Sequence, residues 1–213
     1  MATRNTVLLT GFEPFGGDPV NSSWETARAL DGAELPGGVK VRALQLPCRF
    51  GSALGALHDA IQSQQPRLVL ALGQASNRRA LSLERVAINL IDARIPDNDA
   101  VQPIDVPVVP GGPAAYFATL PLKPMLQALL AAGYPAELSC TAGSYVCNQV
   151  FYGLQHRLRR TVVPSGFLHL PSLSGPEPAL PLERLVSGTR LALEVALQPP
   201  AALAAGFSAG QIS

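Results

Sequence analysis

Cysteine and histidine are both scarce in this chain, which has three of each among its 213 residues. The cysteines, Cys48, Cys140 and Cys147, are odd in number and lack the close paired spacing of a zinc site or a disulfide framework. We therefore expect neither a metal nor another cofactor. Three unpaired thiols suit a reducing compartment, so we expect a cytoplasmic location.

Charge is also scarce, because only 15% of the residues are charged and the formal net charge is +1. No basic stripe or acidic block stands out, which argues against nucleic acid or a membrane surface as the main partner. Long apolar runs are absent as well: none approaches the roughly 18 residues that a membrane-spanning helix needs. The N-terminus also lacks the apolar core and cleavage site of a signal peptide.

Apolar residues are abundant at 47%, enough for the core of a single domain over 1–213, with a loosely ordered tail over 200–213. Strand-like and helix-like segments alternate, a pattern typical of an α/β fold with a largely parallel sheet. We expect 80–95 to be extended and 96–113, rich in proline and aspartate, to be irregular. The predicted strands are 6–10, 39–47, 67–73, 136–140 and 161–171, and the predicted helices are 24–31 (capped by Ser22 or Ser23), 50–64, 123–133, 144–160 and 182–198.

Cys147 has two interpretations. It shares one face of the helix predicted over 144–160 with Val150, Phe151 and Leu154, which is the spacing of a buried core cysteine. It also lies in the first turn of that helix, after the small residues 142–144. Backbone amides at a helix start lower the pKa of a thiol and can hold an oxyanion, as a cysteine nucleophile requires.

His169 closes a predicted strand, a place where catalytic residues collect in parallel sheets, although a buried histidine bonded to a carbonyl would look the same. The other two histidines, His58 and His156, lie in helices amid polar neighbours, and we expect them to be solvent-exposed. If Cys147 needs a base, His169 is therefore the best candidate.

Glu84 is an isolated acid in an apolar, extended stretch next to Arg85. It could form a half-exposed ion pair with an arginine, or it could be the third group that orients a catalytic histidine. Three aspartates further on are rivals for that role, but turn and cap positions explain them adequately: Asp97, Asp99 and Asp105.

The glycine-rich loop after the first strand, GFEPFGG, does not match a phosphate-binding loop, because its glycine spacing is wrong and it lacks the Gly-Lys-Ser/Thr ending. Phe12 and Phe15 are unusual in such a loop. They either fill the core or line an aromatic pocket at the carboxyl edge of the sheet.

Five motifs in order resemble those of the pyrrolidone-carboxyl peptidases, or pyroglutamyl peptidases of type I, over nearly the whole chain. They are TGFEPFGGDPVNSSW (10–24), LALGQASNRRALSLERVAIN (70–89), DARIPDND (92–99), TAGSYVCNQVFY (141–152) and GFLHLPSL (166–173). The departures are Ser76-Asn77 in place of a usual glycine pair, Leu170 in place of valine, and Cys140 where asparagine is common.

The resemblance implies a single α/β/α sandwich, commonly assembled as a homotetramer. It implies a triad of Glu84, Cys147 and His169, with Arg94 helping to polarise the scissile carbonyl. It also implies a substrate pocket in which Asn21 supports Gln74 and the loop of Phe12; the pocket walls are Phe12, Phe15, Ile95, Tyr145 and Val146.

The expected function is hydrolysis of the bond after an N-terminal pyroglutamate, with pyroglutamylated peptides as substrates. Pyroglutamate is an uncharged lactam, so its site needs apolar walls and neutral hydrogen-bonding groups, and the residues implied for the pocket include no acid. Two alternatives remain open. One is a glutaminase- or amidase-type cysteine hydrolase, which would need groups for a free amino acid's charges; the other is a non-catalytic module that binds capped N-termini.

Overall fold

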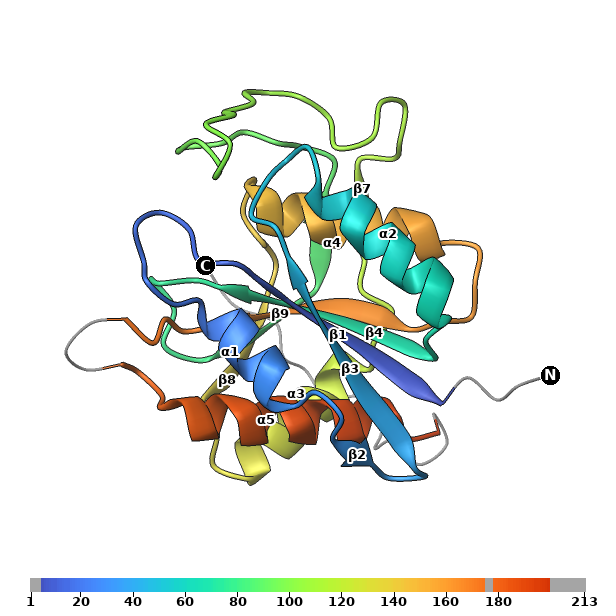
Figure 1. Ribbon diagram of the computed structural model, residues 1–213. Helices are drawn as coiled ribbons and strands as arrows, with labels where there is room; N and C mark the ends of the chain where they lie inside the picture. Colours follow the sequence, from blue (N-terminus) through green and yellow to red (C-terminus); the bar gives the residue numbers. More distant parts are fainter. Residues whose placement is uncertain (1–4, 175–177, 200–213) are drawn as a thin grey trace.

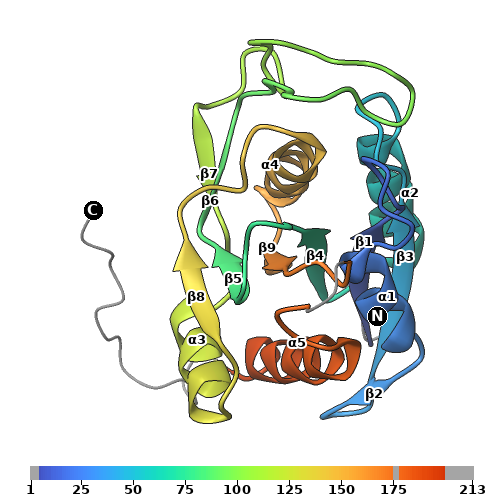
Figure 2. The same cartoon turned by 90° about the vertical axis from the view of Figure 1, so that its left-hand side faces the viewer.

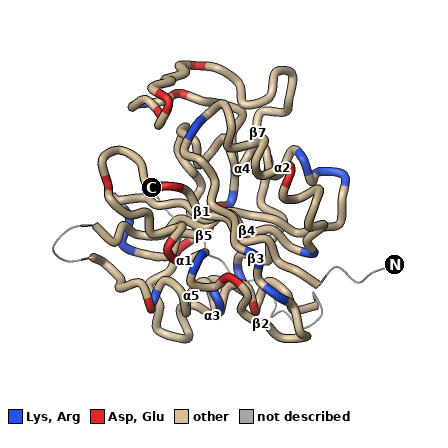
Figure 3. Tube along the Cα trace, viewed as in Figure 1, with Lys and Arg blue, Asp and Glu red and all other residues tan. Residues whose placement is uncertain are grey.

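The structure, a computed structural model, describes residues 5–174 and 178–199 (Figure 1). The tail 200–213, which we expected to be loosely ordered, lies outside the described residues. No helix within the described ranges has the length and apolar character needed to cross a membrane. Charges of both signs are dispersed along the chain (Figure 3).

A seven-stranded sheet forms the middle layer. Its strands are β1 (Thr6–Phe12), β2 (Glu34–Leu35), β3 (Val39–Leu46), β4 (Leu68–Gln74), β5 (Leu81–Glu84), β8 (Ala136–Ser139) and β9 (Ser165–Leu170), in the order β2-β3-β1-β4-β9-β5-β8. Strands β3, β1, β4 and β9 run parallel, whereas β5 and β8 are parallel to each other and antiparallel to β9. The short β2 pairs antiparallel with β3. The prediction of a largely parallel sheet is confirmed.

Helices cover both faces of the sheet, which makes the α/β/α sandwich (Figure 2). The helices α2 (Ala53–Gln64) and α4 (Val146–Leu158) cover one face, and α1 (Ser22–Ala29), α3 (Leu122–Ala131) and α5 (Leu182–Ala196) cover the other. Successive side chains of a strand point to opposite faces, so the fully buried β4 supplies both cores. Leu70 and Leu72 join the core under α3 and α5, and Val69 and Ala71 join the core under α2 and α4.

The start of α1 differs from the prediction. Its N-cap is Asn21 and not Ser22 or Ser23, because the Asn21 side chain accepts a hydrogen bond of 3.0 Å from the backbone N–H of Ser23. The predicted end of α3 is confirmed at Gly133, which has the positive φ of 74° that glycine adopts without strain.

A hairpin of β6 (Val86–Ile88) and β7 (Ala115–Phe117) lies outside the main sheet, and the connection between its strands arches over α4 and α2 (Figure 2). Asn148 in the first turn of α4 holds the hairpin: its Nδ2 donates to the carbonyls of Ile88 and Leu90 at 2.9 Å, and its Oδ1 accepts from the N–H of Ile88 at 3.0 Å. The extended stretch and the irregular stretch that the sequence predicts here are confirmed, although β7 was not predicted.

Candidate active site

The sheet register places Glu84 and His169 side by side. His169 pairs with Ser82 across the antiparallel β5–β9 ladder, and Glu84 pairs with Phe167. Residues two apart on a strand share a face, so Glu84 and His169 are diagonal neighbours on one face of the sheet. That face is the one covered by α4, because Phe167 packs in the core under α2 and α4.

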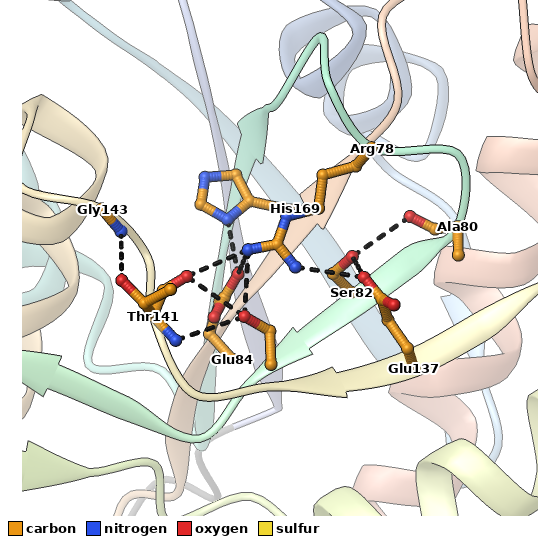
Figure 4. Close-up of polar contacts among 9 residues, drawn as sticks. Arg78, Ala80, Ser82, Glu84, Glu137, Thr141, Gly143 and His169 are labelled. Atoms are coloured by element: carbon orange, nitrogen blue, oxygen red, sulfur yellow. Dashed lines mark hydrogen bonds and ion pairs between the residues drawn. The ribbon is translucent and has the colours of Figure 1, made fainter. Parts of the chain in front are cut away.

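The two side chains meet in a direct hydrogen bond, with 2.7 Å between His169 Nδ1 and Glu84 Oε1. Glu84 is fully buried and only 4% of His169 is exposed. The other ring nitrogen of His169 points away from the carboxylate (Figure 4). Of the two interpretations of Glu84, the structure therefore shows the contact with a histidine. The arginine that pairs with Glu84 is not the adjacent Arg85 but Arg78, at 3.1 Å, which the sequence did not single out.

Cys147 is the second residue of α4 and is half-buried. Its approach to the sheet depends on Gly73, the partner of His169 in the β4–β9 ladder. A Cβ atom on Gly73 would lie 3.0 Å from Cys147 Sγ and 2.8 Å from the ring of Phe167. The Phe167 ring in turn lies 4.8 Å from that of His169, centroid to centroid. A glycine is thus needed where the thiol, the aromatic ring and the histidine strand converge.

No hydrogen bond joins Cys147 to His169 among the described residues, and such catalytic contacts are often long before a substrate binds. Burial raises the pKa of the Cys147 thiol above its ordinary value, and the nearby Cys48 and Glu84 raise it further. The backbone N–H of Cys147 lowers the pKa but does not offset these effects. The lowered pKa expected from the helix start is therefore wrong for this arrangement, because the effect of burial is larger.

The other cysteines and histidines of the chain take no part in the Glu84–His169 contact. Burial raises the pKa of Cys48 to about 12, whereas Cys140 is exposed. His58 and His156 are half-buried and not exposed as expected, because His58 packs beside Gly153 of α4 and His156 Nδ1 lies 2.9 Å from the hydroxyl of Tyr116. Among the described residues there is no group of three or more potential histidine, cysteine or carboxylate metal ligands.

Aromatic side chains gather beside the start of α4. The ring of Tyr145 lies 6.0 Å from that of Phe15 and meets Phe50 edge-on at 5.3 Å, and its hydroxyl donates to the carbonyl of Pro96 at 3.0 Å. Ile95 borders the same loop, since a Cβ atom on Gly16 would lie 4.0 Å from Ile95 Cδ1. Phe50 is a member of this cluster that the sequence did not indicate.

Phe12 and Phe15 have different environments, which separates the two interpretations of this pair. Phe12 is 1% exposed and belongs to the core, as does the fully buried Val146. Phe15 is half-buried and packs against the edge of that core. Arg94 is exposed.

Asn21 and Gln74 both hold the loop that carries Phe15. Gln74 Oε1 accepts from the N–H of Ser22 at 2.8 Å, and its Nε2 donates to Asp18 at 2.7 Å. Asn21 Nδ2 donates to the carbonyl of Glu13 at 3.0 Å. The two side-chain amides thus bind different atoms of the same loop, and both already form hydrogen bonds within the protein in this structure.

A thiol at a helix start, close to a histidine that is bonded to a buried carboxylate, is typical of cysteine hydrolases built on an α/β sheet. The comparison with known proteins narrows this class. The chain belongs to the pyroglutamyl peptidase family, whose model matches residues 5–199.

Relatives and solved structures agree with this assignment. The chain is 53% identical to the pyrrolidone-carboxylate peptidase of Cupriavidus taiwanensis, over 90% of this chain and 93% of that one, and 50% identical to that of Pseudomonas fluorescens, over 97% and 99%. The crystal structure of Bacillus amyloliquefaciens pyroglutamyl peptidase I superposes with a TM-score of 0.85 at 40% identity, covering 90% of this chain and 96% of that one. A mutant pyrrolidone carboxyl peptidase from Pyrococcus furiosus gives 0.86 at 38% identity, covering 90% and 98%.

Gly73→Ala tests the close approach of Cys147 to the sheet. The added methyl group must displace the Phe167 ring or the thiol, and overpacking of this kind costs about 1–3 kcal/mol of folding stability. A shift of about 1 Å in a reacting group can cost roughly 100-fold in rate, so we expect kcat/KM to fall by about that factor. Activity and thermal unfolding measure the two effects.

Gly55→Ala is the matched control, because this glycine lies within α2 with open space around it. It should leave kcat/KM unchanged and add a few tenths of a kcal/mol or more of stability. Wild-type activity in Gly73→Ala would show that the position of the thiol does not depend on Gly73.

Proposed function

We propose that this member of the pyroglutamyl peptidase family removes N-terminal pyroglutamate with Cys147 as nucleophile, His169 as base and Glu84 as the group that orients the histidine. The observation that carries the proposal is the 2.7 Å contact between His169 Nδ1 and Glu84 Oε1. A fully buried carboxylate at that nitrogen favours the tautomer with a proton on Nδ1. Nε2 is then free of its own proton and able to accept one.

The reaction proceeds in two halves. In the first, the thiol proton of Cys147 moves to Nε2 of His169 as the sulfur attacks the carbonyl carbon that follows the lactam ring, and amides at the start of α4 hold the oxyanion. The imidazolium then protonates the leaving amine as the C–N bond breaks, which leaves a thioester on Cys147. In the second half, His169 removes a proton from water, which attacks the thioester and releases free pyroglutamate and the thiol.

Substrate recognition follows from the aromatic cluster. Phe15, Tyr145 and Ile95 offer apolar surface for a flat lactam ring, Phe12 and Val146 support them from the core, and Arg94 serves to polarise the scissile carbonyl. Asn21 and Gln74 serve the substrate indirectly, by fixing the loop that carries Phe15.

The glutaminase alternative is less well supported. Recognition of a free amino acid requires carboxylates for its ammonium group, but those of the neighbouring loop already have partners. Glu13 pairs with Arg49 at 3.4 Å, and Asp18 accepts from Gln74. The binding-module alternative does not account for a buried histidine–carboxylate pair beside a cysteine.

Substitution of the triad should have unequal effects on pyroglutamyl-amide hydrolysis. Cys147→Ala and His169→Ala remove groups that make or break bonds, so each should lower kcat/KM by at least about 10³-fold. Glu84→Gln should retain more activity than either, because an orienting group acts through geometry and tautomer. The measurement is release of a fluorescent amine from a pyroglutamyl substrate under reducing conditions, which a chelator should not affect. Wild-type kcat/KM in Glu84→Gln would contradict the role of Glu84.

Cys140 provides an internal control for the base. Mass-spectrometric mapping after limited iodoacetamide treatment should show that His169→Ala slows labelling of Cys147 and leaves that of the exposed Cys140 unchanged. Equal slowing at both cysteines, or no slowing at Cys147, would contradict the role of His169 as the base for Cys147.

Lactam recognition should discriminate strongly against proline. A site whose buried groups bond the lactam carbonyl and N–H leaves them unpaired when proline enters, and proline also brings a charged amine into an apolar slot. Losing such hydrogen bonds discriminates by about 10⁴-fold or more, whereas apolar shape alone gives roughly 10- to 200-fold. We expect prolyl and glutaminyl analogues to have kcat/KM values at least about 10³-fold below the pyroglutamyl substrate.

Phe15→Ala is the variant that probes the pocket wall, since Phe12→Ala would leave a core cavity that costs about 3–5 kcal/mol of stability. Phe15→Ala should raise KM without reversing the preference for pyroglutamate. Similar kcat/KM values for prolyl and pyroglutamyl substrates in the wild type would rule out a lactam site.

Assembly and location complete the proposal. We propose a cytoplasmic homotetramer: the resemblance to the family implies the tetramer, and three free cysteines suit a reducing compartment. Exposed apolar side chains such as Ile104, Phe117 and Val162, at 64%, 71% and 94% exposure, are surfaces that an assembly would cover. Sedimentation velocity and cell fractionation test these points, and a monomer at micromolar concentration or a secreted product would contradict them.

A further inference from the structure

Arg78 lies in the connection between β4 and β5 and reaches the buried side of the histidine–carboxylate pair (Figure 4). Its Nη2 is 3.1 Å from Glu84 Oε1, the same oxygen that accepts from His169. Nη2 also donates to Ser139 Oγ and to the carbonyl of Thr141 at 3.0 Å. The guanidinium group therefore joins the orienting carboxylate to the end of β8.

A second carboxylate holds the other arm of the guanidinium group. Arg78 Nη1 donates to Glu137 Oε1 at 3.1 Å, and the same oxygen accepts from Ser82 Oγ at 2.6 Å. The Arg78 side chain is only 18% exposed, although it comes from a loop. A planar guanidinium group whose two terminal nitrogens are both bound has little conformational freedom. It can therefore hold a partner such as a carboxylate in one position.

Glu84 needs such a partner. Its carboxylate is fully buried, and its second oxygen, Oε2, is buried with no hydrogen-bond partner in the described part of the structure. A buried carboxylate is costly unless it is paired, and the neutral form of His169 supplies one hydrogen bond but no charge. Arg78 is the permanent cation in contact with it.

Arg78 also reaches the segment that leads to the nucleophile. Thr141 lies between the end of β8 at Ser139 and the start of α4 at Val146, where Cys147 is the second residue. Arg78 thus contacts the carboxylate behind His169 through an ion pair, and its hydrogen bonds hold the chain that enters the cysteine helix.

We infer that Arg78 is a positioning residue of the active site, which compensates the buried carboxylate of Glu84 and keeps it directed at His169. The inference rests on the proposed function. The titratable groups around Glu84 are His169 on β9, Cys147 on α4, Arg78 on the β4–β5 connection and, through Arg78, Glu137 on β8.

The sign of the pH effect follows from these charges. Without the guanidinium, the buried Glu84 carboxylate takes up a proton more readily as the pH falls. Where Glu84 remains ionised, its full negative charge favours the imidazolium form of His169. Both changes remove the neutral, correctly oriented histidine at a higher pH than in the wild type, so the acid limb of the kcat/KM profile moves to higher pH.

The test compares Arg78→Met with Arg79→Met, because Arg79 is adjacent and exposed. Loss of the outer partner of a metal-binding side chain typically costs about 10- to 100-fold in activity. By analogy, we expect kcat/KM of Arg78→Met to fall by about 10- to 100-fold, mainly in kcat, with the acid limb displaced to higher pH. Arg78→Lys keeps the positive charge but lacks the planar guanidinium group. Compared with Arg78→Met, it should return the acid limb to its wild-type position and recover only part of the wild-type kcat. Arg79→Met should match the wild type in both.

A double-mutant cycle with Glu84→Gln separates positioning from a general structural role. If Arg78 acts through Glu84, then Arg78→Met and Arg78→Lys each cost much less in the Glu84→Gln background than alone. Equal costs in both backgrounds, or an unmoved acid limb in Arg78→Met, would overturn the inference. If Arg78→Met does not fold, the cycle with Arg78→Lys decides alone. Failure of the proposed function is a distinct result, since the wild type would then not cleave the pyroglutamyl substrate at all.

Discussion

The burial of one carboxylate, that of Glu84, is the constraint on which the site depends. A charge with no exposure must be compensated by its neighbours, and here the two contacts to its Oε1 come from His169 at 2.7 Å and Arg78 at 3.1 Å. One of these contacts holds the imidazole of His169, and the other links the carboxylate, through Arg78, to the end of β8. The same burial that makes the pair costly also strengthens it, because little water competes for the oxygen.

The sheet supplies the geometry. The reversal of β5 relative to β9 places Glu84 diagonally across from His169, and the parallel pairing of β4 with β9 places Gly73 beside the histidine. The missing side chain at Gly73 then leaves room for Cys147 to approach from α4. Glu84, Cys147 and His169 are far apart in the chain. They lie close together because one mixed sheet and one glycine bring their backbones near each other.

Much of the architecture could be predicted from the sequence. The periodicity of β4 and α5 and the glycine after α3 are local features, and the structure has the expected elements there. Failures occurred where tertiary contacts compete with local preference. Asn21 caps α1 in place of a serine because its amide also bonds the loop at Glu13, and His156 is half-buried because Tyr116 packs against it. The pKa of the Cys147 thiol was misjudged because burial exceeds the effect of the helix start.

The sequence by itself determined the layered α/β class, the family and the three residues proposed as the triad, because these depend on periodicity and on motifs that are contiguous in the chain. Only the tertiary structure decided which partner Glu84 has, which of Phe12 and Phe15 stays partly exposed, and which arginine contacts Glu84. Those outcomes depend on strand direction and on side chains that are distant in sequence. Arg85 is the neighbour of Glu84 along the chain, but the loop before β5 brings Arg78, and not Arg85, to the Glu84 carboxylate.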